Sequence, residues 1–375
     1  MNLGILSWII DSQRTGVYNY LYYLLKNMIE MGKSHEMFLI HDKKTNDPLY
    51  KAANDVIIPK IPFKLTYAIG LPYITRKTKI DILHVPAHGY SQIMPFFLNS
   101  NVKKILTIHD LTPLLFPETH TKKTLQWWVS SLNLIKSRTD VIIADSLNTK
   151  NDCINYLNIP NEKIKVIPLA ADSIYRPSKH KEEIREDLEK RYGIKFPFIL
   201  SVGTLEKRKN IPNLIKAFNQ LKERGTNHKL VIIGSNGWKY RDIFNTANEL
   251  NLEKDVLFTG YIPNEDLVKF YNAADLFVYP SIYEGFGLPP LEAMACGCPV
   301  ITSNSSSLPE VVGNAGITVD PHDYDALADK MYQILTNDSL RSKLHNKSLK
   351  RAKMFSWEKT ARETWKVYEE VLETE

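Results

Sequence analysis

Two carboxylates, Glu284 and Glu292, flank a glycine turn at Gly285 and Gly287. An apolar, strand-like run precedes the turn, and two prolines follow it, where the first turn of a helix tolerates residues without an N–H donor. A strand, a glycine turn and a helix N-terminus offer backbone amides and a favourable dipole to an anion. Carboxylates beside such a cradle would accept hydrogen bonds from sugar hydroxyls, so the combination predicts a sugar-nucleotide site. On spacing alone, glutamates that merely stabilise a helix start remain an equal alternative.

A basic run, Leu205–Asn210, ends directly before a helix that we expect to begin near Ile211. Arg208 and Lys209 lie in this run, and Asn210 is the candidate N-cap residue. Two cations fixed beside helix amides would neutralise a diphosphate, which arginine can bind through two parallel hydrogen bonds. A solvated charged loop is the structural alternative that the run by itself leaves open.

The stretches Tyr279–Val300 and Leu205–Asn210 resemble the signature motifs of the retaining glycosyltransferases of family 4. The resemblance implies an α/β protein with the GT-B fold, in which two Rossmann-like, doubly wound parallel-sheet domains face a cleft. It also implies retaining transfer of a hexose from a nucleotide-diphosphate sugar. No metal or other cofactor is expected, because Arg208, Lys209 and the turn amides would stabilise the leaving diphosphate.

The same resemblance assigns roles to individual residues. Glu292 would bind ribose hydroxyls, and Glu284 would position the transferred sugar, since the family's retention is attributed to front-face substitution and not to a carboxylate nucleophile. Thr204 stands where many family members have an arginine, which leaves the diphosphate one cation fewer. The donor-binding candidates besides Glu292 lie after strands and in the glycine turn: Gly203, Thr204, Tyr261, Ile262, Gly285, Phe286, Gly287 and Leu288.

In the first half of the chain, a predicted strand ends with His109 and Asp110. A lone histidine is most often structural, but at the carboxyl end of a strand it can contact a bound sugar, and the pair resembles the family's His-Asp motif. We therefore take His109 as catalytic together with Glu284, Arg208 and Lys209. Asp110 is expected to fix the local turn or to orient the histidine.

Other residues of the first half carry less specific signals. Gly16 follows the first predicted strand, where the family has a glycine-rich loop, and would let backbone amides approach the donor or the acceptor. Asp145 and Ser146 follow another strand, and capping of the next helix is the interpretation we favour. His84 and His88 are candidates for the acceptor side.

Strand-like runs alternate with helical stretches along the chain, which predicts two parallel, doubly wound sheets. We expect an N-terminal acceptor domain at 1–170 and a C-terminal nucleotide-sugar domain at 171–354. The resemblance implies that the last helix, in 355–375, packs back on the first domain. The predicted strands are Leu3–Ser7, Met37–Ile40, Val56–Ile58, Ile82–Val85, Lys104–Ile108, Val141–Ala144, Phe198–Val202, Leu230–Ile233, Val256–Thr259, Leu276–Tyr279 and Val300–Thr302.

The composition is that of a globular protein, with 375 residues and 43% apolar side chains. Three cysteines give no disulfide framework and suit a reducing compartment, and we expect no metal site at Cys296 and Cys298. The apolar N-terminus has no basic leader region, and the sequence has no run of 18 apolar residues. We therefore expect a cytoplasmic protein.

Positive charge is concentrated in the first half of the chain. Residues 1–172 hold 20 Lys and Arg against 14 Asp and Glu, whereas the remainder holds 28 of each. Ordinary variation explains this equally well, but Pro59–Lys79 and Lys122–Arg138 interleave basic with aromatic residues, as peripheral contacts with the inner membrane surface do. Nucleic acid is not an expected partner.

Among donors we favour GDP-mannose, because the motifs look most like those of mannosyltransferases that build polysaccharides. The acceptor would be a glycan or a lipid-linked saccharide. The alternatives within the fold are a UDP-glucose-dependent glucosyltransferase and a nucleotide-sugar epimerase. A two-lobed solute-binding protein should have an export signal, and a nucleic-acid-binding protein should bind polyanions with steep salt dependence.

Overall fold

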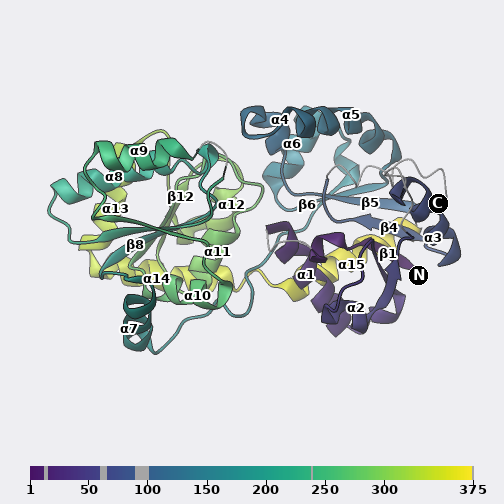
Figure 1. Ribbon diagram of the computed structural model, residues 1–375, viewed down its shortest axis with the longest axis horizontal. Coiled ribbons are helices and arrows are strands. Elements are labelled where there is room, and N and C mark those ends of the chain that lie inside the picture. Colours follow the sequence, from purple (N-terminus) through teal and green to yellow (C-terminus); the bar gives the residue numbers. More distant parts are fainter. Residues whose placement is uncertain (12–15, 60–65, 89–100, 238–239, 374–375) are drawn as a thin grey trace. The chain divides into compact units, whose positions relative to one another are not determined.

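The computed structural model describes residues 1–375 apart from 12–15, 60–65, 89–100, 238–239 and 374–375. The chain forms two compact units (Figure 1). The N-terminal unit comprises residues 1–169 and 356–375, and the C-terminal unit comprises residues 170–355. None of the described helices is long and apolar enough to cross a bilayer.

The N-terminal unit is built on a seven-stranded sheet in the order β3-β2-β1-β4-β5-β6-β7. Every strand pair in it is parallel, and strands β1 and β4 are buried along their whole length, as expected for a sheet covered on both faces. The strands are β1 (Leu3–Leu6), β2 (Met37–His41), β3 (Asn54–Ile57), β4 (Ile82–Val85), β5 (Lys103–Ile108), β6 (Val141–Ala144) and β7 (Ile164–Val166).

Helices cover both faces of this sheet (Figure 1). One face carries a core cluster to which α3, α5 and α6 contribute, and α1 packs against the C-terminal helix α15. The helices of the unit are α1 (Gly16–Glu30), α2 (Pro48–Ala52), α3 (Leu71–Lys77), α4 (Thr112–Leu115), α5 (Lys122–Arg138), α6 (Leu147–Leu157) and α15 (Trp357–Glu373).

Helix α15 is held to the N-terminal unit by polar contacts as well as by its apolar face. Thr360 Oγ1 donates to the carbonyl of Pro168 at 2.7 Å. The hydroxyl of Tyr368, which is fully buried, lies 2.7 Å from His84 Nδ1 in β4. The last segment of the chain is therefore part of the core of the first unit.

The C-terminal unit has a six-stranded parallel sheet in the order β10-β9-β8-β11-β12-β13. Its strands are β8 (Phe198–Val202), β9 (Lys229–Ile233), β10 (Val256–Gly260), β11 (Leu276–Tyr279), β12 (Val300–Ser303) and β13 (Ile317–Val319). Its helices are α7 (Lys181–Tyr192), α8 (Ile211–Glu223), α9 (Arg241–Glu249), α10 (Asn264–Ala273), α11 (Leu288–Ala295), α12 (Leu308–Val312), α13 (Tyr324–Thr336) and α14 (Asp338–Ala352).

Two apolar clusters sandwich this second sheet. Helices α8, α9 and α13 build one cluster, and α7, α10, α11 and α12 build the other (Figure 1). The predicted fold class, two parallel doubly wound sheets, is confirmed. Strands β7 and β13 were not predicted, because each is an edge strand of three residues and is too short to show a period.

Tyr368→Phe tests how α15 is anchored. The change removes the hydroxyl that pairs with His84 and leaves a buried ring nitrogen without this partner, so the N-terminal unit should lose about 1–3 kcal/mol of unfolding free energy. Urea unfolding followed by tryptophan fluorescence measures the loss. Tyr73→Phe, at an exposed tyrosine, is the matched control. An unshifted midpoint for Tyr368→Phe would show that the hydrogen bond does not anchor the helix.

Candidate functional site

The carboxyl ends of neighbouring strands in the C-terminal unit carry most of the predicted donor residues. Gly203 follows β8, Gly234 follows β9 and Tyr261 follows β10, while the glycine turn follows β11. Ligands of open parallel sheets bind at this edge. The loops pack closely there, since a Cβ on Gly234 would lie 1.9 Å from the carbonyl oxygen of Gly203. Only glycine fits that approach.

Glu284 is the centre of a buried ion cluster at this edge. Its Oε1 accepts hydrogen bonds from Lys209 Nζ at 2.6 Å, Tyr279 Oη at 2.9 Å and Ser281 Oγ at 2.6 Å. Its Oε2 lies 2.8 Å from a guanidinium nitrogen of Arg208. Burial would raise the pKa of this carboxyl, but Arg208 and Lys209 outweigh burial and lower the pKa to about 2. Glu284 is therefore a carboxylate with both oxygens engaged.

The two cations are less free than the sequence suggested. Besides Glu284, Arg208 contacts the carbonyl of Tyr283 at 2.5 Å and Glu206 Oε1 at 2.6 Å. Lys209 is 9% exposed, and burial lowers the pKa of its ammonium group. A diphosphate at this edge would share both cations with carboxylates that already hold them in place.

Serines after β12 hold the glycine turn. Ser306 Oγ accepts from the amide of Glu284 at 2.9 Å, and Ser307 Oγ donates to the carbonyls of Glu284 at 2.8 Å and Phe286 at 2.5 Å. These serines were not among the predicted site residues, although a run of three serines after a predicted strand was a visible signal. They fix the backbone whose amides would face an anion.

Gly287 ends the turn and stands at the N-cap of α11 with φ +122°. A Cβ at this position would lie 2.9 Å from Leu308 Cδ2, so both the backbone angle and the packing require glycine. Phe286 is buried against Phe355, which leaves only its backbone for a ligand. Leu288 begins the helix.

Glu292 lies in α11 and is 8% exposed. Tyr271 Oη donates to its Oε2 at 2.9 Å. Burial raises the pKa of Glu292 to about 7, with a further contribution from the charge of Asp172 and an opposing one from the Tyr271 hydrogen bond. The two glutamates that flank the turn are thus opposite in character: Glu284 is firmly charged, and Glu292 titrates near neutrality.

The structure also refines three sequence-based interpretations at this edge. Tyr261 is 58% exposed and free to meet a ligand, whereas Ile262 is buried and offers only its backbone. Thr204 is exposed. Asn210 is the N-cap residue of α8, as predicted, but its side chain makes no capping bond, and Nδ2 instead donates to the carbonyls of Pro280 and Pro321.

In the N-terminal unit, His109 follows β5 and pairs with Asp145, which follows β6. His109 Nδ1 lies 2.6 Å from Asp145 Oδ2, and Nε2 lies 3.0 Å from the carbonyl oxygen of Pro86. Asp110 instead fixes the turn, because its Oδ1 accepts from the amide and the hydroxyl of Thr112. Of the two roles we expected for Asp110, the structure shows the turn, and Asp145 orients the histidine.

The remaining first-half candidates divide between core and surface. Ser146 caps α6 by accepting from the amide of Thr149, as predicted. The suggestion that His84 lines the acceptor side is wrong, since it is fully buried and bonds to Thr107 and Tyr368.

His88 is partly buried, and its Nε2 lies 2.6 Å from Ser131 Oγ. Gly16 is exposed at the start of α1, and the preceding residues 12–15 lie outside the described part of the chain.

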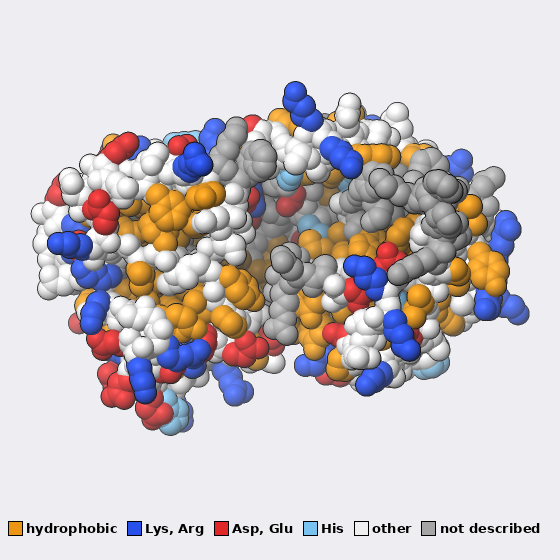
Figure 2. Space-filling view, viewed as in Figure 1, with side chains coloured by type: hydrophobic (Ala, Val, Ile, Leu, Met, Phe, Trp, Pro, Cys, Tyr) orange, Lys and Arg blue, Asp and Glu red, His pale blue; other side chains and the backbone are white. Residues whose placement is uncertain are grey.

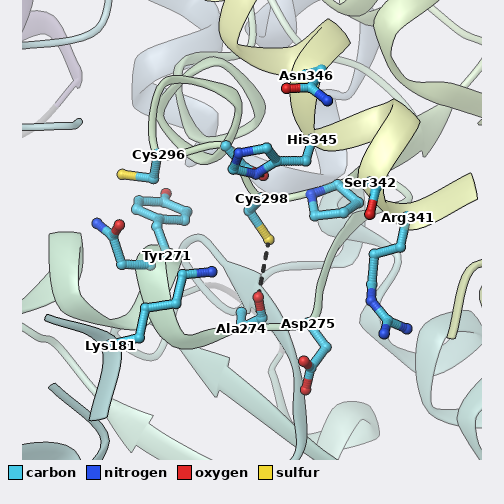
Figure 3. A pocket seen from close by; sticks show the side chains of 13 residues that line it. Lys181, Tyr271, Ala274, Asp275, Cys296, Cys298, Arg341, Ser342, His345 and Asn346 are labelled. Carbon is cyan, nitrogen blue, oxygen red and sulfur yellow. Dashed lines mark hydrogen bonds between the residues drawn. The ribbon is translucent and has the colours of Figure 1, made fainter. Parts of the chain in front are cut away.

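A separate hollow of about 370 Å³ lies at the opposite edge of the second sheet, around the starts of β11 and β12 (Figure 3). Cys296 and Cys298 line it, and burial raises the pKa of both thiols. Tyr271 also lines it while its hydroxyl reaches Glu292. Within the described ranges, no group of three or more His, Cys, Asp or Glu side chains is arranged to hold a metal ion.

Comparison with known proteins identifies the class. The fold matches that of sucrose-phosphate synthase from Thermosynechococcus elongatus, with TM-score 0.81, 22% identity and all of both chains covered. It also matches Anabaena HepE solved with UDP and glucose, with TM-score 0.75, 18% identity and 98% of each chain covered. The fold is that of the GT-B glycosyltransferases.

Sequence relatives identify the family. A model described as "Glycosyl transferases group 1" matches residues 180–351, and one described as "Glycosyltransferase Family 4" matches residues 14–173. O-antigen chain mannosyltransferase B of Escherichia coli is 36% identical over 75% of this chain and 73% of its own length. The serotype-specific mannosyltransferase WbdA of Escherichia coli is 30% identical over 83% of this chain. The matched part is only 37% of the length of WbdA. The chain belongs to glycosyltransferase family 4.

Glu292→Gln should reveal the energetic cost of the buried carboxylate. The pKa of Glu292 is about 7 in the folded chain and near 4.5 when the side chain is exposed. The free-energy cost of ionising the buried carboxyl is therefore absent below about pH 4, grows between pH 4.5 and pH 7, and is fully present above pH 7. The variant should be more stable than the parent at pH 8, by on the order of 2–3 kcal/mol, and the gain should shrink toward pH 5.

Urea unfolding at the two pH values measures this difference. Glu249→Gln, at an exposed position of α9, is the control and should show no pH-dependent gain. A Glu292→Gln variant that is less stable at pH 8 than the parent would contradict the raised pKa.

Proposed function

We propose that the protein transfers mannose from GDP-mannose to a glycan or lipid-linked acceptor, with retention of the anomeric configuration and without a divalent metal. The observation that carries this proposal is the buried cluster of Glu284, Arg208 and Lys209 beside the glycine turn and Glu292. The cluster holds two cations beside the start of α11, and Glu292 would accept hydrogen bonds from sugar hydroxyls. These are the groups that a sugar nucleotide requires.

The choice of mannose is supported by the relatives. Two proteins that are similar to most of this chain are named mannosyltransferases, and one of them acts on an O-antigen chain. GDP is the nucleotide that the resemblance of the Leu205–Asn210 and Tyr279–Val300 motifs favours. UDP-glucose remains the competing donor in the test below.

The cations support a metal-free mechanism. Arg208 and Lys209 lie at the carboxyl edge of the sheet, and α11 begins directly after the glycine turn with its amides unpaired within the helix. As the glycosidic bond breaks, negative charge grows on the leaving diphosphate, and preorganised donors stabilise that charge without reorganisation. Glu284 keeps both cations in position for this task.

The same cluster supports front-face substitution. A nucleophilic carboxylate must bring one oxygen up to the anomeric carbon, but Glu284 Oε1 accepts three hydrogen bonds and Oε2 pairs with Arg208. Attack by Glu284 would break these contacts and leave Lys209 buried without its counter-charge. Positioning of the cations is the role that these contacts support for Glu284, which would order the transferred sugar through them.

The acceptor side would contact the cytoplasmic face of a membrane through α3 and the helical turn before it, Thr66–Gly70. Ile69 and Tyr73 are 51% and 55% exposed, and Lys77 Nζ lies 5.9 Å from the Tyr73 ring. Figure 2 shows basic and hydrophobic side chains next to one another at this end of the N-terminal unit. The second stretch suggested by the sequence, α5, contributes less, since Trp128 is buried against His88.

A donor panel tests the proposed reaction. We expect GDP-mannose to raise the melting temperature and to be hydrolysed slowly, with both effects unchanged by EDTA. UDP-glucose and UDP-N-acetylglucosamine are the comparison donors, and release of free sugar with retained configuration is read by NMR. Stabilisation by UDP-glucose alone would overturn the mannose assignment, and loss of the effect with EDTA would overturn the metal-free mechanism.

Two alanine variants separate binding from turnover. Glu292→Ala should raise the KM for the donor by about tenfold or more with a smaller change in kcat, because it removes a contact to the bound nucleotide. His109→Ala should lower kcat by about 10²-fold with little change in KM. Initial rates over a range of donor concentrations give both constants. Equal, small effects from both variants would defeat these assignments.

A further inference from the structure

His109 and Asp145 form a buried pair whose geometry limits where a proton can sit. Asp145 is 2% exposed and His109 is 17% exposed. The carbonyl oxygen of Pro86, 3.0 Å from His109 Nε2, can only accept a hydrogen bond, so Nε2 carries a hydrogen. Asp145 Oδ2, 2.6 Å from Nδ1, is a carboxyl oxygen. The pair is ionised if the shared proton is bonded to His109 Nδ1, and neutral if it is bonded to Asp145 Oδ2.

The surroundings favour a proton on both ring nitrogens. A carboxyl is about two to three units more acidic than an imidazole before any shift. Burial opposes charge on both partners and raises the pKa of the Asp145 carboxyl, but the carboxylate and its hydrogen bond also raise the pKa of the His109 ring. The hydrogen that Nε2 donates to Pro86 leaves Nδ1 as the site of the second proton. The pair is then an imidazolium and a carboxylate joined by a charge-assisted hydrogen bond.

The other titratable groups near the ring agree with this state. Asp110 adds a second negative charge on the same loop and raises the pKa of His109 further. His84, in β4, has its pKa lowered to about 3 by burial and by the charge of His109, so it stays neutral. Tyr20, in α1, packs edge-on against the ring with centroids 4.8 Å apart, and burial raises the pKa of its hydroxyl.

We propose that Asp145 is a positioning residue that holds His109 as a fixed, doubly protonated imidazolium, so that His109 acts on the substrate as a positive charge and not as a base. The inference rests on the proposed function, in which His109 supports turnover. Neither ring nitrogen has a lone pair free to take a proton.

The proton of the acceptor hydroxyl must therefore go elsewhere. In the transfer step, the bond from the anomeric carbon to the diphosphate oxygen breaks, and the bond from that carbon to the acceptor oxygen forms. The hydroxyl proton passes to the departing diphosphate oxygen, which balances the step. An imidazolium cannot take this proton, so its contribution would be electrostatic, through the negative charge that develops on the bound substrate.

Asp145→Asn in the full-length chain is the decisive variant. Without the carboxylate the pKa of His109 should fall, so the charged fraction should be small at pH 8 and should recover as the pH is lowered. At saturating donor, we expect kcat of the variant to drop at least tenfold at pH 8 and to rise again toward pH 5.5, while kcat of the parent stays constant between these values. A histidine that works as a neutral base predicts the opposite, with the variant more active than the parent at low pH.

Asp140→Asn is the matched control. Asp140 lies at the other end of the same strand, β6, and accepts a hydrogen bond from the amide of Lys104 at 2.7 Å. An asparagine can keep that bond. The control should therefore leave the pH profile unchanged.

A spectroscopic measurement tests the ionisation without any turnover. In protein labelled with ¹⁵N-histidine, and with the His109 signals assigned through His109→Gln, both ring nitrogens of the parent should keep imidazolium shifts up to pH 8. In the Asp145→Asn variant the His109 ring should titrate below pH 7, and in the Asp145→Glu variant its pKa should be high again. A parent ring with one unprotonated nitrogen at pH 7 overturns the proposal even if Asp145→Asn fails to fold. This readout is independent of donor identity, so failure of the proposed function does not affect it.

Discussion

The buried pairing of Glu284 with Arg208 and Lys209 is the constraint on which the donor side of this protein depends. The three side chains come from loops that follow β8 and β11, which are neighbours in the second sheet. Removing one partner from such a cluster leaves an uncompensated buried charge, at a cost of about 3–5 kcal/mol. The cluster therefore fixes both loops relative to the sheet, and the glycine turn and the start of α11 follow from it.

The N-terminal unit uses the same device on a smaller scale. β5 and β6 are adjacent parallel strands, and the residues that follow them, His109 and Asp145, bring opposite charges together below the surface. In both units, a cation that could act on a substrate is held by a carboxylate that comes from the next strand. Its position is thus set by the sheet and not by a flexible side chain.

Glu292 lowers the stability of the folded chain when it is ionised, because its carboxyl group is buried. A carboxyl buried beside Tyr271 is uncharged at low pH and costly when it ionises, and an amide or an apolar residue would suit this place in α11 better. Glu284 carries no such penalty, because its cations compensate for burial. The two glutamates thus differ in what burial costs them, and the proposed contact of Glu292 with the donor would offset its cost.

The sequence by itself determined the fold class and the donor motif, because both are local: strand-like runs alternate with helices, and the Tyr279–Val300 stretch is contiguous. The tertiary structure decided which groups meet. The partnership of His109 with Asp145, the hold of Ser306 and Ser307 on the turn, and the burial of His84 under Tyr368 all join residues far apart in the chain. The order of the strands in each sheet decides which loops are neighbours. This order cannot be read from the spacing of residues along the sequence.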